Sequence, residues 1–182
     1  MTIEAENVTP SSPVPSFDNC PGMFAEPQRE HTWLQELVGE WTFESECVGE
    51  PGKPTEKFRG TESVKPLGKL WIVGEGQGEM PGGGSALMML TLGFDPQRNR
   101  FVGTWQGSMM THLWVYGGEL DTDGRVLILN AEGPSFSGDG TTAKYQDVVE
   151  VKSPDHRILT SRMQNSDGTW TQFMTAHYRR KK

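Results

Sequence analysis

Side chains that could bind or transform a small molecule concentrate in two short segments of the sequence. One runs from Trp105 to Tyr116 and the other from Trp170 to His177. Both combine aromatic rings with methionine, hydroxyl and imidazole groups, which is a typical lining of a small-molecule site. Alternate residues of a β-strand share a face. If the first segment is a strand, His112 therefore lies on the same face as Trp114 and Tyr116.

The inward face of the last strand depends on which basic residue near its end points into the fold. If Arg179 faces inward, His177 does so as well, together with Thr171, Phe173 and Thr175. The opposite alternation places Met174, Ala176 and Tyr178 inside. We favour the first arrangement, with His177 inside. The sequence assigns no catalytic residue and no metal ligand. The predicted ligand-binding residues are Trp71, Met88, Trp105, His112, Trp114, Phe173, Thr175 and His177.

The same residue types also have structural roles. A single histidine on a strand is more often a hydrogen-bonded structural residue than a ligand or a base, and tryptophan and methionine commonly fill cores. An enzymatic hypothesis uses His112 or His177 as a general base, oriented by Glu75 or Asp147. That hypothesis predicts dispersed catalytic residues, since no Gly-x-Ser-x-Gly nucleophile motif occurs.

Known cofactor and metal motifs are absent from the sequence. It contains no His-x-His, Cys-x-x-Cys or His-Glu-x-x-His spacing, so no metal site is predicted. The glycine-rich residues 74–78 follow a predicted strand but precede no predicted helix, unlike a dinucleotide-binding loop. We expect His31 and His156 at the surface, at a helix start and in a turn.

Composition restricts the class of protein. The chain has 182 residues, enough for one domain, with 17 Lys and Arg against 24 Asp and Glu. A net charge of −7 argues against nucleic-acid binding, which needs a positive face. No apolar run is long enough to span a membrane, and the acidic N-terminus lacks the apolar core of a signal peptide. We therefore expect a cytoplasmic protein with reduced cysteines, although Cys20 and Cys47 could also pair.

Periodicity and turn signals predict the elements that position these residues. Residues 1–28 are expected to form a flexible tail and residues 29–182 a single domain. Apolar residues at helical spacing predict a short helix over 29–38, which Gly39 ends. Ten strands are predicted beyond it, separated by turns such as Asp-Gly at 123–124 and 167–168. Their ranges are 41–48, 57–66, 69–77, 86–94, 100–108, 111–119, 125–132, 144–152, 156–164 and 169–179.

A meander of about ten strands must protect its two edges. Closure into a barrel removes both of them, and a barrel of eight to ten strands can hold a small ligand inside. The sequence therefore predicts an all-β protein, a closed up-and-down antiparallel β-barrel with a short N-terminal helix.

Two resemblances support this fold. The short helix followed by Gly39-Glu40-Trp41 resembles the Gly-x-Trp entry of the calycin superfamily of lipocalins and fatty-acid-binding proteins. In that superfamily a basic residue of the last strand packs over the tryptophan, a role for which Arg179 and Arg180 are candidates. Over residues 30–182 the chain more closely resembles the domain-of-unknown-function 1579 family. The segments that carry this resemblance are residues 37–41, 92–95, 101–105, 110–116 and 173–178.

The resemblance implies a calycin-like barrel and no particular activity. Our main hypothesis is a barrel that binds a small, mostly apolar molecule in its interior. A second hypothesis is a haem-binding barrel that resembles nitrobindin, with His177 or His112 as the axial ligand. A third is an isomerase or hydrolase that uses a barrel histidine, and a fourth is a packed structural protein without a ligand. An acidic surface and a detached tail are compatible with a homodimer.

Overall fold

The computed structural model describes residues 25–48, 55–80 and 83–182. These residues form one helix followed by ten strands. The elements are α1 (Arg29–Gln35), β1 (Gly39–Cys47), β2 (Glu56–Leu67), β3 (Trp71–Glu79), β4 (Ser85–Asp95), β5 (Arg100–Gly107), β6 (Trp114–Leu120), β7 (Val126–Pro134), β8 (Thr142–Ser153), β9 (His156–Gln164) and β10 (Trp170–Arg180).

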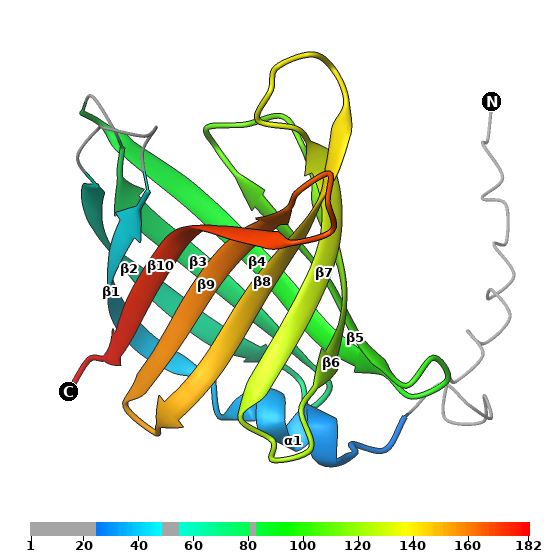
Figure 1. Ribbon diagram of the computed structural model, residues 1–182. Coiled ribbons are helices and arrows are strands. Elements are labelled where there is room, and N and C mark those ends of the chain that lie inside the picture. The colour runs from blue at the N-terminus through cyan, green and yellow to red at the C-terminus, as the bar shows by residue number, and fades with distance from the viewer. Residues whose placement is uncertain (1–24, 49–54, 81–82) are drawn as a thin grey trace, which may run out of the picture.

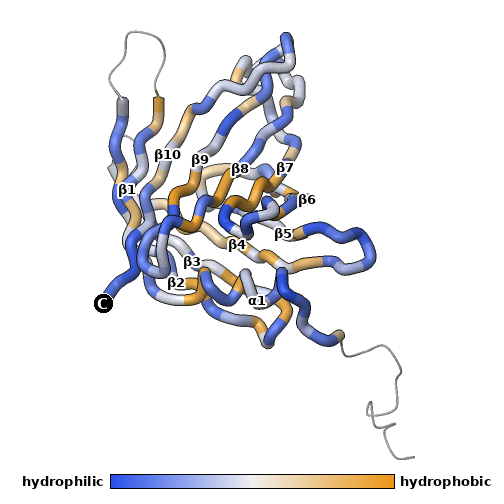
Figure 2. Tube along the Cα trace, turned by 60° about the horizontal axis from the view of Figure 1, so that its bottom comes forward, coloured by the Kyte–Doolittle hydropathy of each residue, from blue (hydrophilic) through white to orange (hydrophobic). Residues whose placement is uncertain are grey.

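The strands form a closed barrel in which neighbours in sequence are neighbours in space (Figure 1). All pairs are antiparallel, and β10 closes the barrel by pairing with β1. Hydrophobic and hydrophilic positions alternate along the strands, as Figure 2 shows, because successive side chains point to opposite faces of the sheet. The predicted all-β barrel with a short N-terminal helix is confirmed.

The observed elements differ from the predicted ones in a few places. The strand predicted over 111–119 begins at Trp114, so His112 lies in the connection between β5 and β6. Most of the predicted tail, residues 1–24, lies outside the described residues. Cys20 lies there too, so its pairing with Cys47 stays a prediction.

Helix α1 covers one end of the barrel, at the bottom of Figure 1. Its apolar side chains meet inward-facing residues at the ends of β1, β3, β4 and β5, and this contact forms the main core. Each such side chain contributes about 1.5–3 kcal/mol when it is fully buried. The most deeply buried large side chains are Leu34, Trp41, Ile72, Leu92, Phe101 and Leu127.

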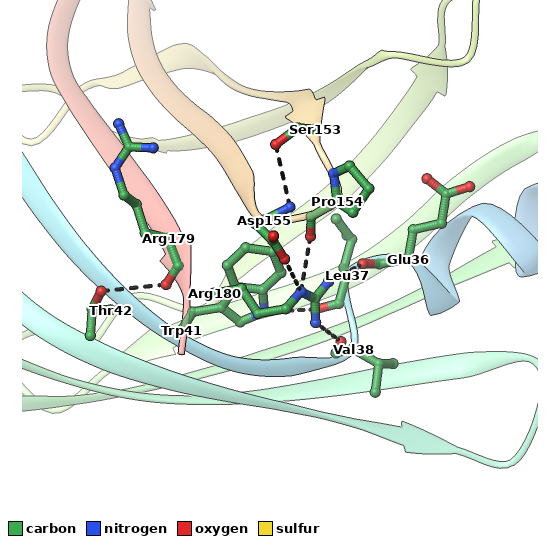
Figure 3. A network of polar contacts seen from close by, with 10 residues as sticks. All are labelled: Glu36, Leu37, Val38, Trp41, Thr42, Ser153, Pro154, Asp155, Arg179 and Arg180. Atoms are coloured by element: carbon green, nitrogen blue, oxygen red, sulfur yellow. Dashed lines mark hydrogen bonds and ion pairs between the residues drawn. The ribbon is translucent and has the colours of Figure 1, made fainter. Parts of the chain in front are cut away.

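Arg180 at the end of β10 joins this closed end to the helix (Figure 3). Its guanidinium carbon lies 4.2 Å from the centre of a Trp41 ring. The guanidinium donates hydrogen bonds to the carbonyl oxygens of Val38 at 2.6 Å, Glu36 at 3.0 Å and Pro154 at 2.9 Å. A β-carbon at position 39 would collide with the same guanidinium, which explains the glycine there. Of the two candidates in the sequence, Arg180 therefore packs over Trp41.

This contact determines the orientation of β10. Trp41 and Phe43 are buried inside the barrel, and they pair with Arg180 and Tyr178. Residues directly opposite each other on paired strands share a face. Tyr178 and Ala176 therefore face inward, and His177 faces outward. The favoured assignment of His177 to the interior was wrong, because it started from Arg179 and a shift of one residue exchanges the two faces.

Candidate functional site

A carboxylate lies inside the barrel on β8. Asp147 pairs with Leu129 on β7 and Ser161 on β9, both of which are buried. Its two oxygens accept hydrogen bonds from different hydroxyls, Oδ1 from Ser161 at 2.5 Å and Oδ2 from Tyr116. An inward-facing carboxylate in an apolar barrel is costly unless it is hydrogen-bonded. These two donors provide that compensation.

A second polar group inside the barrel is an ion pair. Arg157 of β9 donates to the carboxylate of Glu62 on β2. Their side chains are only 7% and 13% exposed, respectively. The guanidinium carbon also lies 4.6 Å from the centre of a Trp41 ring and 4.5 Å from that of Tyr178. Arg157 thus contacts one carboxylate and two aromatic rings.

The environment shifts the pKa values of three interior groups. Burial raises the pKa of Asp147 above its ordinary value, and the hydrogen bonds from Ser161 and Tyr116 only partly offset this. Burial, followed by the negative charge of Asp147, holds the pKa of Tyr116 well above its usual range. The pKa of Tyr178 is raised by burial and by Glu62. Both phenols therefore stay protonated at neutral pH and can donate hydrogen bonds.

Apolar side chains surround these polar groups. Several of them face inward by their pairing and are nevertheless only partly buried. An inward-facing side chain that is only partly buried borders either the interior of the barrel or its open end. These residues are Met88, Leu90, Trp105, Val149, Leu159, Met163 and Met174.

Strands β6 and β7 separate toward the end of the barrel that lies away from α1. Their backbone pairing extends only from Leu120 to Gly117 on β6. Beyond that point side chains bridge them: His112 donates from Nε2 to the carbonyl oxygen of Glu132 at 3.1 Å, and the Trp114 ring packs on Gly133. The glycine is needed because a β-carbon there would overlap that ring.

A depression of about 1060 Å³ extends across this opening and along the outer face of the barrel. Its walls include outward-facing residues such as Val115 and Glu132. They also include Tyr116, Ala131 and Tyr145, which face inward. The depression therefore reaches Tyr116, the donor to Asp147.

Aromatic rings line the end of the barrel opposite α1. Tyr145 lies between Trp114 and Phe136, at centroid distances of 4.8 and 5.7 Å. Phe136 in turn lies 5.1 Å from Phe173 and is 63% exposed. This end therefore offers an apolar, partly exposed rim, whereas the opposite end is closed by α1.

A family model matches residues 26–180 of the chain, and its description is "Protein of unknown function (DUF1579)". The protein belongs to the DUF1579 family. The match covers the helix and all ten strands, and it confirms the family resemblance seen in the sequence. No curated protein matches the chain.

Solved structures share the fold of this DUF1579 protein. Rv2717c from M. tuberculosis has a TM-score of 0.56 at 13% identity, over 86% of this chain and 100% of its own. An S-type phycobiliprotein lyase from Guillardia theta has a TM-score of 0.51 at 15% identity, over 86% of this chain and 99% of its own. A designed fluorescence-activating β-barrel has a TM-score of 0.44 at 18% identity, over 81% of this chain and 96% of its own. Likeness at these identities concerns the fold alone.

The predicted site residues of this DUF1579 protein fall into three groups. Met88, Trp105 and Trp114 face the interior by their strand pairing. His112 and Phe173 lie at the rim of the open end, where His112 also lines the depression. The remaining three, Trp71, Thr175 and His177, face outward. The eight residues are thus not brought together in one site.

The outward residues have local partners on the outer surface. The Trp71 ring covers Gly93 of β4, and the Thr175 hydroxyl accepts a hydrogen bond from Gln172 at 2.7 Å. His177 stacks with His156 at a centroid distance of 5.6 Å. Burial lowers the pKa of His156, and the positive charge of Arg179 lowers it further.

Haem ligation inside the barrel does not fit the observed histidines. All four histidines of the sequence are among the described residues. His31, expected at the surface, is a buried residue of α1 and hydrogen-bonds to the Phe94 carbonyl oxygen at 3.2 Å. His156 and His177 lie outside the barrel, and His112 is engaged with Glu132 at the rim. No imidazole therefore lines the interior.

Sequence reasoning did not single out Glu62, Arg157 or Ser161. It placed Tyr116 on the same face as Trp114, and it placed Tyr178 inside only in the alternation that was not favoured. It considered Asp147 only as a partner for histidine. A usable signal was the alternation of β9, in which Arg157, Leu159, Ser161 and Met163 share a face. Without the pairing partners, that face cannot be assigned to the interior. Among the residues that the structure describes, no cluster of His, Cys, Asp and Glu could hold a metal ion.

Proposed function

We propose that this protein binds a small, mostly apolar molecule in the barrel interior. The observation that carries the proposal is a lining of inward-facing apolar side chains that remain partly exposed, around a small group of buried polar residues. Protein sites for small molecules commonly have this composition, with few polar groups that orient the ligand. The Gly-x-Trp entry with Arg180 over Trp41 further supports a calycin-like assignment.

The opening between β6 and β7 offers a route for the ligand. The depression there reaches Tyr116 and Tyr145 from outside, and side chains rather than backbone hydrogen bonds bridge the strands. Side chains change rotamer within nanoseconds when exposed, whereas a continuous ladder must unfold locally to open. Within the ligand-binding set, we retain Met88, Trp105 and Trp114 as contacts and His112 and Phe173 as rim residues.

Location and assembly complete the proposal. Within the described residues no helix is long and apolar enough to cross a membrane. We place the protein in the cytoplasm, without a nucleic-acid partner because of its net charge of −7, and we keep a homodimer as a proposal for its assembly. A packed structural protein without ligand is the hypothesis that the binding experiment must exclude.

Thermal unfolding with the neutral probe 2-(2-naphthyl)ethanol tests the binding proposal. A ligand at 100 times its dissociation constant stabilises the folded state by about 2.7 kcal/mol. For a chain of this size that corresponds to a rise in Tm of roughly 5–10 °C. The charged analogues 2-(2-naphthyl)ethylamine and 2-naphthylacetate complete the panel of probes. If none of the panel raises Tm, and native mass spectrometry of the purified protein finds no retained molecule, the interior is a packed core.

A matched pair of variants on β9 locates the binding site. Leu159→Trp adds volume inside the barrel, because Leu159 pairs with Val149 and Ala176. Ile158→Trp adds the same ring on the outer face, where Ile158 pairs with Glu150 and His177. We expect the first variant to lose probe binding and the second to keep it. Equal effects would contradict an interior site.

A further inference from the structure

The charges inside the barrel indicate what kind of polar group the ligand carries, an inference that rests on the proposed function. The charged side chains on the inward face in the described part of the chain are Glu56, Glu62, Asp147, Arg157 and Arg180, of which Glu56 is exposed at the end away from α1. Arg180 is held by three carbonyl oxygens at the closed end, and Arg157 is paired with Glu62. Both interior cations therefore already have partners.

Asp147 differs from the paired Glu62 and from the two arginines because it has no cationic partner. No described lysine, arginine or histidine lies within ion-pair distance of its carboxylate. Its contacts are the hydroxyls of Tyr116 and Ser161, both neutral donors. Each carboxylate oxygen has accepted one hydrogen bond and keeps capacity for another. The residue is also partly exposed although its side chain faces inward.

Tyr178 supplies a second polar atom nearby. Its ring lies against Arg157 and faces inward, and its hydroxyl is close enough to Asp147 and Glu62 for both charges to raise its pKa. In the described part of the chain no side chain donates to or accepts from this hydroxyl. A phenol can accept a hydrogen bond from a ligand as well as donate one.

From this geometry we propose that the interior ligand carries a basic nitrogen, and that its protonated amine pairs with Asp147 beside Tyr178. An ammonium group satisfies the free acceptor capacity of the carboxylate and compensates its charge, which burial otherwise disfavours. An anionic head group would instead face Asp147 and Glu62, with Arg157 already neutralised. A neutral hydroxyl would be accommodated, but without the stronger charge-assisted hydrogen bond.

Three probes with one shape and different charge test this selectivity. They are 2-(2-naphthyl)ethylamine, 2-(2-naphthyl)ethanol and 2-naphthylacetate, each titrated by isothermal calorimetry at neutral pH. A charge-assisted hydrogen bond contributes more than a neutral one, so we expect the amine to bind roughly tenfold or more tightly than the alcohol. The acid should bind most weakly. If the alcohol or the acid equals the amine, this inference is wrong while interior binding stands, whereas binding of none of them, with no retained molecule in native mass spectrometry, refutes the proposed function.

Asp147→Asn, with Glu150→Gln as control, identifies the residue responsible. Asparagine keeps the shape of Asp147 but removes the negative charge, so the preference for the amine over the alcohol should fall to about one. Glu150 lies on the same strand and faces outward, so its variant should keep the preference. An unchanged preference in Asp147→Asn would overturn the assignment.

The wild-type protein supplies a second measurement in case Asp147→Asn fails to fold. The amine probe stays protonated in acid, whereas the Asp147 carboxylate, whose pKa is raised, becomes neutral as the pH falls. The groups facing it are Tyr116, Ser161 and Tyr178, which remain neutral in this range, and the Glu62–Arg157 ion pair. The ratio of amine to alcohol affinity should therefore fall in acid. A ratio independent of pH would refute the pairing.

Discussion

The ion pair between Arg157 and Glu62 should be a strong determinant of stability that depends on both partners. In Arg157→Met the Glu62 carboxylate stays inside the barrel, where it is only 13% exposed, without its cation. Removal of one partner from a buried pair typically costs about 3–5 kcal/mol, since an uncompensated charge remains. Two cation–π contacts, with Trp41 and Tyr178, are lost as well, although methionine packs favourably on aromatic rings.

Together these effects predict a loss of about 4 kcal/mol in the free energy of unfolding for Arg157→Met. With a urea dependence of about 2 kcal/mol per molar, the unfolding midpoint should fall by about 2 M. The double variant Glu62→Gln with Arg157→Met leaves no buried charge. We expect it to recover most of the loss and to lie within about 1–2 kcal/mol of the wild type, because replacement of a buried pair by neutral groups is often tolerated.

Equilibrium urea unfolding of the wild type, both single variants and the double variant gives the coupling energy directly. If Arg157→Met lies within about 1 kcal/mol of the wild type, the pair is not buried as described. If the double variant is as unstable as the sum of the single ones, the two residues do not interact. Either result would refute the polar arrangement on which the proposed ligand chemistry depends.

Three further outcomes follow from the same structure. Burial raises the pKa of Asp147 in the folded protein above its ordinary value of 3.8. In urea unfolding, the free energies of unfolding of Asp147→Asn and of the wild type should therefore be closest in strong acid. As the pH rises through the raised pKa, the wild type should lose stability relative to Asp147→Asn. Arg180→Ala, which frees three carbonyl acceptors, should cost about 2–4 kcal/mol in thermal unfolding, against less than about 0.5 kcal/mol for the outward Arg179→Ala. His177→Ala should change stability by less than about 0.5 kcal/mol and leave probe binding intact, and loss of binding would return this histidine to the site.

The sequence predicted the barrel well because the information it requires is local. Strand alternation, Asp-Gly turns and the helix before Gly39 depend on short segments, and the ten strands followed in the expected order. Family resemblance added the position of Trp41. The register between β1 and β10 does not depend on local signals, because it pairs residues that lie far apart in the sequence. The hydrogen bond from Arg180 to the Val38 carbonyl oxygen is an example of such a long-range contact.

The candidate site could not be predicted for that reason. His177 and Tyr178 are neighbours in sequence, and both have ring systems that suit a ligand site. Which one faces inward depends on whether Arg179 or Arg180 packs over Trp41, and the sequence offers both in succession. One step of register therefore replaced an imidazole by a phenol in the interior, and with it the expected chemistry of the site.

Charge compensation provides a way to choose between the two faces. With Arg157, Asp147, Glu62 and Tyr178 inside, one cation and one carboxylate form a pair, and the second carboxylate receives two hydroxyl donors. The opposite face of β9 and β10 would place Arg162, Arg179 and His177 inside, together with Glu44 and Glu46 of β1 and Glu150 of β8. That interior would bury more charged side chains than the observed one, which is expensive in a low dielectric. The observed face leaves the carboxylate of Asp147 hydrogen-bonded but without a cation, and that residual charge is what the proposed basic ligand would compensate.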